Sequence, residues 1–282
     1  MRWLALLLAV AATMAPPSAA QPRAPRLRHV HSFALGIGTG SLDGDLARRF
    51  AGYDLVVVDG VGASAAQVRA LRSGGRIVLA YLDVGTIEKG RPWFAAARTY
   101  RLELWRQWGE WYADTSRAGY RRLISRRVAP SLLAKGFDGL FLDNTDMVAT
   151  HPRQGPGMRA LVRALAARVH ARRGLLFAQN GDDTVGPLLG VLDGWNREDV
   201  TSTYSFATGR YTRVGASDAA AARAALRRAA TRGALVTATD YAEAKDISTL
   251  AESVRNACAV GALPFVSDIG LTRLPQPPLR CG

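Results

Sequence analysis

Residues 136–146 have the sequence GFDGLFLDNTD, and this stretch carries the pattern that decides the fold. A glycine closes a helical stretch, a continuous apolar run follows, and polar residues come directly after the run. A continuous apolar run is typical of a strand that is covered on both faces, as in a parallel sheet. The stretch is therefore predicted to be a buried parallel strand that carries Asp143, Asn144 and Asp146 at its carboxyl end.

The same pattern recurs along the chain, and in total it predicts eight strands. They are expected at Phe33–Ile37, Leu55–Val58, Ile77–Leu82, Gly139–Leu142, Leu175–Ala178, Val191–Trp195, Ala234–Ala238 and Ala262–Val266. Stretches with helical periodicity lie between them, for example Met158–Ala171 and Asp218–Thr231. Eight strand–helix units predict an α/β fold, a single (β/α)8 TIM barrel. A doubly wound open sheet is the alternative, but no GxGxxG follows the first strand.

The N-terminus has the features of an export signal. Arg2 precedes the apolar run Leu4–Val10, and Ser18-Ala19-Ala20 provides small residues for cleavage. We expect a signal peptide at residues 1–20, a linker at 21–28 and the barrel at 29–282. An uncleaved N-terminal helix is the alternative. The apolar run is too short to span a bilayer, so a secreted or periplasmic protein without a membrane span is predicted.

The chain is strongly basic, with a formal net charge of +14 that falls to +13 when Arg2 leaves with the signal. Almost all the basic residues are arginines in alanine-rich helical stretches, such as Arg121-Arg122 and Arg172-Arg173. A surface that attracts polyanions is one interpretation, and solvated helix faces are the other. We favour the second and expect no nucleic-acid partner, because no basic run is interleaved with aromatic residues.

The only two cysteines are Cys258 and Cys281. In an exported protein an even pair predicts a disulfide, which here would join the C-terminal tail to the last helix. Closing a loop of this length stabilises by roughly 3 kcal/mol in the chain-entropy model.

Acidic residues stand at the ends of most of the expected strands, and Gln179-Asn180 ends the fifth. The acids are Asp59, Asp83, Asp143 and Asp146, Glu198, Asp240 and Asp268. A single Asp after a strand is more often a helix N-cap, but the carboxyl ends of barrel strands converge on one pocket. A pair of carboxylates can cleave a glycosidic bond, one as a proton donor and the other as a nucleophile or base. Crowding of like charges also keeps one of them protonated.

Other chemistries fit the sequence less well. His29 and His31 form an HxH pair, but His151 and His170, the remaining histidines, lie away from the expected strand ends. We therefore predict no metal and no cofactor. The chain also lacks a GxSxG motif.

A long connection, Glu88–Ala113, follows the third expected strand and contains Trp93, Trp105, Trp108 and Trp111. Long loops at this end of a barrel usually build the active site, where indole rings stack on sugars. Aromatic residues at such spacing are often core, so we expect about half of the four to be structural.

At these residues the chain resembles glycoside hydrolase family 114, the endo-α-1,4-polygalactosaminidases and their uncharacterised relatives, over nearly the whole mature length. The matching segments are Tyr53-Asp54 to Asp59, Tyr81-Leu82-Asp83-Val84-Gly85 with Arg91-Pro92, Trp111-Tyr112-Ala113-Asp114, Gly136 to Asp146, Gln179-Asn180, and Asp193-Gly194 to Glu198. The chain departs from the pattern at Asp83, where a small residue is frequent, and at Gln179, where polygalactosaminidases often have Lys.

The resemblance implies a glycoside hydrolase that cleaves an exopolysaccharide, endo-acting on an α-linked galactosamine-type glycan, with Asp143 and Glu198 as the catalytic carboxylates. Ten further residues are expected to bind the polysaccharide: Asp59, Tyr81, Asp83, Asn144, Asp146, Gln179, Asn180, Tyr204, Asp240 and Tyr241. Polygalactosamine is cationic, so a basic protein needs a locally acidic cleft to bind it. A monomer is expected. The alternatives are a catalytically inactive carbohydrate-binding barrel and a structural barrel of the cell envelope.

Overall fold

The computed structural model describes residues 25–39 and 45–282. The expected signal peptide and the first part of the expected linker lie outside these residues. The described end of that linker contacts the barrel: Pro25–Leu27 forms a 3-10 turn, Leu27 is fully buried, and Arg26 forms an ion pair with Asp138. Arg72 donates two hydrogen bonds of 3.0 Å to the same carboxylate. The end of this segment therefore packs as part of the barrel.

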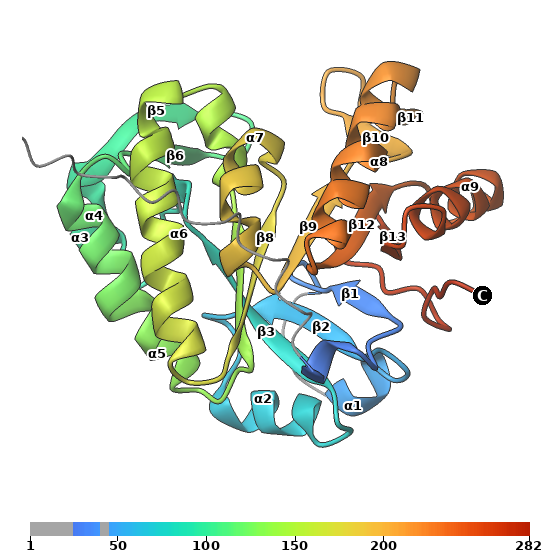
Figure 1. The fold of residues 1–282 in the computed structure, drawn as a ribbon, viewed down its shortest axis with the longest axis horizontal. Helices are drawn as coiled ribbons and strands as arrows, with labels where there is room; N and C mark the ends of the chain where they lie inside the picture. Colours follow the sequence, from blue (N-terminus) through green and yellow to red (C-terminus); the bar gives the residue numbers. More distant parts are fainter. Residues whose placement is uncertain (1–24, 40–44) are drawn as a thin grey trace, which may run out of the picture.

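Eight parallel strands form one sheet in the order β1-β2-β3-β7-β8-β9-β12-β13 (Figure 1). Their bounds are β1 Phe33–Leu35, β2 Leu55–Asp59, β3 Ile77–Asp83, β7 Gly139–Asp143, β8 Leu175–Gln179, β9 Gly194–Glu198, β12 Leu235–Tyr241 and β13 Leu263–Ser267. The edge strands β1 and β13 lie side by side, and the rings of Phe33 and Phe265 pack edge to face across them at 5.9 Å. The sheet is thus a nearly closed barrel, which confirms the predicted (β/α)8 fold.

Helices cover the outside of the sheet in the alternating order that the sequence predicts (Figure 1). They are α1 Leu46–Arg49, α2 Ala65–Arg72, α3 Phe94–Ala97, α4 Ala118–Leu123, α5 Ala129–Leu133, α6 Gly155–His170, α7 Asp182–Val185, α8 Ala216–Thr231 and α9 Ile247–Cys258. A π-helical turn, Ile124–Val128, joins α4 to α5. Among the described residues, none of these helices combines the length and the apolar character that a bilayer span requires.

The strands lie close to their predicted positions, except the sixth. It was expected at Val191–Trp195, but β9 begins and ends three residues later, at Gly194–Glu198. The apolar residues before it belong instead to a 3-10 turn, Gly186–Val191, that has Pro187 in its first turn. The shift places Glu198 inside the strand, as its last residue.

Two positions of the backbone before and within β7 require glycine. Gly136 has φ +96°, a left-handed conformation that suits the predicted turn before β7. At Gly139 an added Cβ would lie 1.8 Å from the backbone oxygen of Leu175, so the close approach of β7 and β8 excludes any side chain there.

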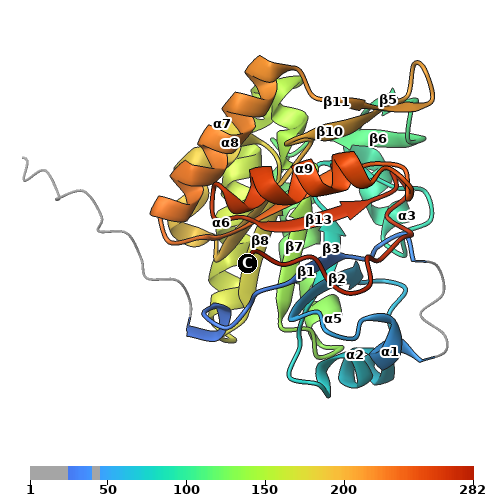
Figure 2. The same cartoon turned by 90° about the vertical axis from the view of Figure 1, so that its right-hand side faces the viewer.

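Two hairpins interrupt the strand–helix alternation at the same end of the barrel (Figure 2). The long connection after β3 folds into a three-stranded sheet of β4 Thr86–Ile87, β5 Arg101–Trp105 and β6 Glu110–Ala113. Between β9 and α8 the chain forms the antiparallel pair β10 Ser202–Ser205 and β11 Arg210–Arg213.

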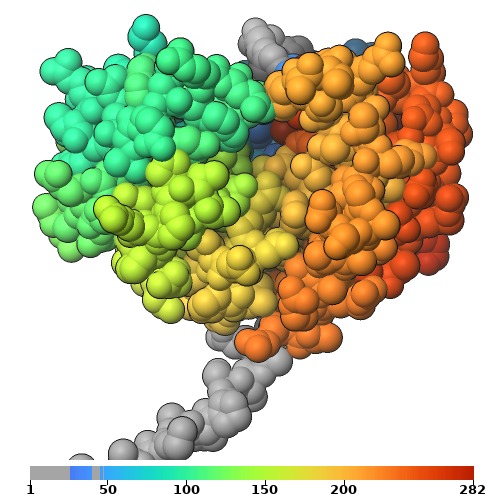
Figure 3. All heavy atoms as spheres, turned by 90° about the horizontal axis from the view of Figure 1, so that it is seen from above, coloured from blue at the N-terminus to red at the C-terminus, as the bar shows by residue number. Residues whose placement is uncertain are grey.

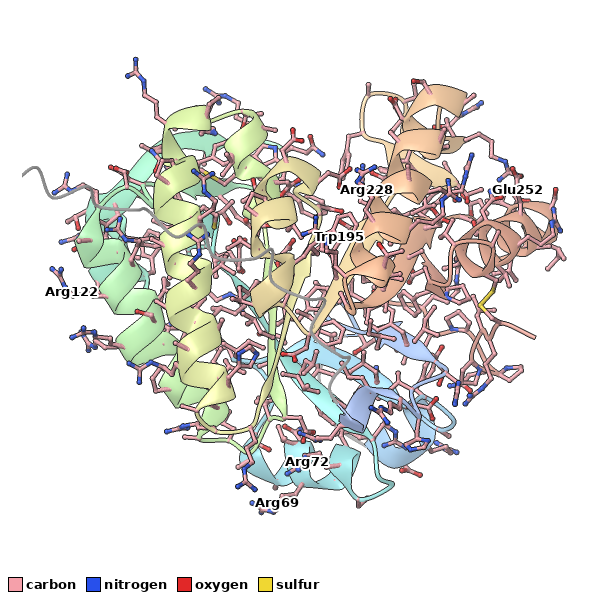
Figure 4. The ribbon with its side chains drawn as sticks, viewed as in Figure 1. Arg69, Arg72, Arg122, Trp195, Arg228 and Glu252 are labelled. Carbon is pink, nitrogen blue, oxygen red and sulfur yellow. A yellow bond between two sulfur atoms is a disulfide. The ribbon has the colours of Figure 1, made fainter. Side chains whose placement is uncertain are left out.

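The predicted disulfide is present: Cys258, the last residue of α9, is bonded to Cys281 with the two Cα atoms 5.4 Å apart (Figure 4). The bond holds the C-terminal tail against the last strand–helix unit, where the tail follows β13.

We predict that the double variant Cys258→Ser/Cys281→Ser is less stable to unfolding by about 3 kcal/mol, because its unfolded chain is no longer cross-linked. Urea denaturation measures this. Reductant should destabilise the wild type by the same amount and leave the double variant unchanged. Equal stability of the two proteins without reductant would contradict the expectation.

Candidate active site

A cavity of about 450 Å³ opens at the carboxyl end of the barrel strands. In Figure 3 it lies between the lobe that contains β5 and β6 and the lobe that contains β10 and β11. Ten of the twelve residues that the sequence singled out for catalysis or binding line it: Asp59, Tyr81, Asp143, Asn144, Asp146, Gln179, Asn180, Glu198, Tyr204 and Tyr241. Asp83 and Asp240 do not line it.

Asp143, the last residue of β7, is held by three hydrogen-bond donors. The Tyr81 hydroxyl donates to Oδ2 at 2.6 Å, and the Gln179 amide donates to Oδ1 at 3.0 Å. The backbone N–H of Asn144 also donates to Oδ1, at 2.7 Å. Burial raises the pKa of Asp143, and these donors oppose the rise because they stabilise the anion.

A buried amide in the barrel interior orients Gln179. Asn196, at the centre of β9, donates from Nδ2 to Gln179 Oε1 at 2.8 Å, so Gln179 presents its NH2 group to Asp143. The Asn196 oxygen in turn accepts hydrogen bonds from the hydroxyls of Thr237 and Thr239 on β12. Sequence reasoning missed Asn196. Its signal was a polar residue at an inward position of a strand, two residues before Glu198.

Glu198 is half-buried and has two side-chain partners, one just after β8 and one on β12. Asn180 Nδ2 donates to Oε2 at 2.7 Å, and the Tyr241 hydroxyl donates to Oε1. Burial, followed by the charges of Asp143 and Asp199, raises the pKa of Glu198 to about 8. The guanidinium of the neighbouring Arg197 pairs with Asp182, with Nε 3.1 Å from the carboxylate, and donates to the backbone oxygen of Glu198 rather than to its side chain.

Three successive strands end in the same way. Asn144, Asn180 and Asp199 each follow the last residue of β7, β8 or β9, and they have φ values of 55°, 52° and 55°. Asn and Asp are the residues that tolerate this left-handed conformation best after glycine. The turn lets the chain leave the barrel directly after the functional side chain, and strained backbone of this kind concentrates at functional sites.

The remaining charged residues make the cavity strongly acidic. Seven carboxyl groups line it: Asp59, Glu88, Glu110, Asp143, Asp146, Glu198 and Asp199. Among the described lining residues, Arg91 alone is basic, and it forms ion pairs of 2.7 Å with both Asp59 and Glu88. Burial, followed by the charge of Asp143, raises the pKa of Asp146 to about 6.

Asp83 and Asp240 correct the expectation that all the strand-end acids face one cleft. Asp83 accepts hydrogen bonds from the backbone N–H groups of Gly85 and Thr86 and from the side chain of Asn144. Asp240 accepts from three consecutive backbone N–H groups, residues 200–202, at 2.8 to 3.1 Å. Both carboxylates are buried and stabilise the loops that carry the cavity walls.

Asp83, Glu88 and Glu110 each have a carboxylate oxygen within 4.8 Å of the others, a spacing that would fit a cation. Their oxygens already have partners in this structure, since Asp83 accepts the hydrogen bonds described above, Glu88 pairs with Arg91, and Glu110 accepts from the Thr86 hydroxyl. Glu88 and Glu110 line the cavity, and Asp83 lies behind them in the loop that it stabilises.

Of the four tryptophans of the β3–α4 connection, two line the cavity and two have structural contacts, as expected. Trp105 and Trp108 line the cavity. Trp93 packs against the core, and Trp111 contacts the ring of Phe94 and the guanidinium of Arg101.

The sequence profile of glycoside-hydrolase family GH114 matches residues 12–274. The chain belongs to this family. It is therefore a glycoside hydrolase, and GH114 membership agrees with the resemblance found in the motifs. Comparison with curated protein sequences gave no significant match.

Solved structures of low sequence identity share the fold of this GH114 protein. The glycoside hydrolase domain of PelA from Pseudomonas aeruginosa is 22% identical and has a TM-score of 0.72, with 87% of this chain and 97% of that chain covered. Ega3 from Aspergillus fumigatus, solved with galactosamine, is 15% identical and has a TM-score of 0.69, with 92% and 97% covered.

The raised pKa of Glu198 predicts an alkaline limit to activity. A carboxyl group with a pKa of about 8 is protonated below that pH, so if Glu198 supplies the proton for cleavage, kcat/KM should fall as the pH rises through about 8. The Tyr241→Phe variant removes a hydrogen bond that lowers the pKa of Glu198, so its alkaline limb should move to higher pH. The pH profile of kcat/KM measures both effects.

Tyr204→Phe is the matched control, because it removes a phenol hydroxyl from the cavity wall that makes no contact with Glu198 in the described structure. Its alkaline limb should coincide with that of the wild type. An unmoved limb in Tyr241→Phe would contradict the expectation that ionisation of Glu198 sets the alkaline limit.

Proposed function

We propose that this GH114 protein is an exported endo-hydrolase of an α-linked galactosamine-type exopolysaccharide, and that Asp143 and Glu198 are its catalytic carboxylates. The observation that carries the proposal is an acidic cavity, with seven lining carboxyl groups, in a chain whose net charge is +14.

The charge of the cavity favours an amino sugar with a free amine. Galactosamine residues are ammonium ions at neutral pH, so they gain charge attraction from these carboxylates, whereas a neutral glycan gains only hydrogen bonds and an acidic glycan is repelled. The basic exterior repels a polycation at long range, but interactions between exposed charges are screened beyond roughly 10 Å. Inside the cavity the local carboxylates dominate, because partly buried charges are screened much less. The structurally similar Ega3 was solved with galactosamine.

The different surroundings of the two carboxyl groups support different roles. Asp143 has three donors that stabilise its anion, including Tyr81 and Gln179, so it fits the nucleophile. Glu198 has a pKa of about 8, which fits a group that begins the reaction protonated. The charge of Asp143 itself contributes to that rise, so ionisation of the nucleophile keeps the proton on the acid.

In this mechanism Glu198 donates its proton to the glycosidic oxygen while Asp143 attacks the anomeric carbon. The bond to the leaving sugar breaks and a glycosyl ester of Asp143 forms. Glu198, now a carboxylate, removes a proton from a water molecule that attacks the same carbon and releases Asp143. Two displacements retain the anomeric configuration.

The substrate of an endo-hydrolase of this kind lies outside the cytoplasm. The residues 1–20 that are expected to form a cleavable signal, and the Cys258–Cys281 disulfide, both support export.

We predict that the protein releases new reducing ends from polygalactosamine faster than from the fully N-acetylated polymer. The difference in kcat/KM should be about tenfold or more, because a single ammonium–carboxylate contact of about 1 kcal/mol or more is lost at each subsite. Activity on the free amine should also fall with added salt. Equal rates on both polymers would contradict the proposed substrate, and binding without turnover would favour an inactive carbohydrate-binding barrel.

The carboxamide variants Asp143→Asn and Glu198→Gln should each lose roughly 10²–10⁴-fold or more in kcat, measured as reducing-end release. The control is Asp183→Asn, which makes the same change at an exposed acid of α7 that does not line the cavity. Near-normal activity of either variant would refute the assignment of Asp143 and Glu198 as the catalytic carboxylates. Product of inverted anomeric configuration, seen by NMR at early times, would refute Asp143 as the nucleophile.

A further inference from the structure

The two hairpins that extend from the barrel have closely similar turns. In the first, the N–H groups of Trp108 and Gly109 donate to the oxygen of Trp105, and Gly109 has φ +70°. In the second, the N–H groups of Thr208 and Gly209 donate to the oxygen of Ser205, and Gly209 has φ +65°. Each turn holds one large ring over the cavity, Trp108 in the first and Phe206 in the second.

These two rings meet. The centroids of Trp108 and Phe206 are 5.3 Å apart with the ring planes at 72°, an edge-to-face contact between segments that are nearly a hundred residues apart. They are the central members of a continuous row of rings with centroids 5.0 to 6.3 Å apart: Tyr112, Trp105, Trp108, Phe206, Tyr204 and Tyr211. We name this row the aromatic arch.

The arch is fixed at both ends and exposed in the middle. Tyr112 packs on the ring of His151 at 4.3 Å, and the Tyr211 hydroxyl accepts a hydrogen bond from the N–H of Ile269 at 3.2 Å. Trp108 and Phe206 are 46% and 45% exposed. Large rings held half exposed over a cavity are typical of a binding surface, because their apolar faces stay unburied until a ligand covers them.

The carboxylates and the arch lie on different elements of the same cavity. Asp143 and Glu198 end barrel strands, whereas Trp105, Trp108, Tyr204 and Phe206 line it from the two hairpins. A short oligosaccharide bound at the catalytic pair needs only the strand ends, but a polymer has further sugar rings that must pass beside the hairpins.

We propose that Trp108 and Phe206 determine substrate length: their joined rings bind sugar rings of the polymer outside the cleaved linkage. This inference rests on the proposed function. It assigns the preference for polymer over short oligosaccharide to the arch, and the chemistry to the strand-end carboxylates.

The test compares kcat/KM for polygalactosamine with kcat/KM for a galactosamine trisaccharide in each variant. In Trp108→Ala and in Phe206→Ala the ratio of polymer to trisaccharide should fall about tenfold, the size expected for the loss of aromatic stacking. The double variant should lose little more than either single variant, because the rings act as one surface. Trp108→Phe, which keeps an aromatic face, should keep most of the preference.

Leu104→Ala is the matched control: Leu104 is an exposed apolar residue of β5, 40% exposed, on the same hairpin and outside the cavity lining. Its ratio should equal that of the wild type. Unchanged ratios in both alanine variants, or an equal fall in Leu104→Ala, would refute the proposed role of the aromatic arch. Neither result would contradict the proposed hydrolase activity. A wild type that releases no reducing ends from either substrate would instead refute the proposed function.

Discussion

Two half-buried carboxyl groups in one cavity, Asp143 and Glu198, impose the constraint that the rest of the site satisfies. Like charges in a poorly solvated cavity cannot both ionise at low cost, so one must be stabilised as an anion and the other kept protonated. The protein achieves this with donors rather than with a basic residue beside the pair. In the proposed mechanism the Tyr81 hydroxyl and Gln179, which Asn196 orients, favour the anion of Asp143, and the charge of that anion helps to raise the pKa of Glu198.

The same constraint explains how charge is distributed over the molecule. Arginines extend outward from the outer helices, as Arg122 does in Figure 4, while the carboxylates gather at the strand ends. Twelve Lys or Arg residues and three Asp residues lie between residues 115 and 175, so this segment alone supplies +9 of the total +14. Only Arg91 enters the cavity lining within the described chain, and there it is neutralised by two acids. A guanidinium nearer the pair would lower the pKa of Glu198 and deprotonate the proposed proton donor.

The barrel strands and the two hairpins have different roles in the site. The strands place the reacting groups with little freedom, because each carboxylate ends a strand whose hydrogen bonds fix it to both neighbours. The two hairpins, by contrast, are built from residues outside the eight-stranded sheet and form the walls of the cavity. A change in the length or the rings of a hairpin would therefore alter the walls of the cavity without disturbing the strands.

The sequence by itself determined the eight strands, the disulfide and the convergence of Asp59, Asp143 and Glu198, because apolar runs, an even cysteine pair and strand-end acids are local patterns. It also placed Asn144 and Asn180 correctly, at turns whose left-handed backbone suits Asn. Only the tertiary structure decided which acids face the cavity. Asp83 accepts hydrogen bonds from N–H groups of the turn that follows it, and Asp240 accepts them from a loop forty residues earlier in the chain. The path of that turn and of that loop cannot be derived from composition, so the sequence could not show that these two acids face away from the cavity. The meeting of Trp108 with Phe206 was equally beyond sequence reasoning, since it depends on how far two separate hairpins lean over the same barrel end.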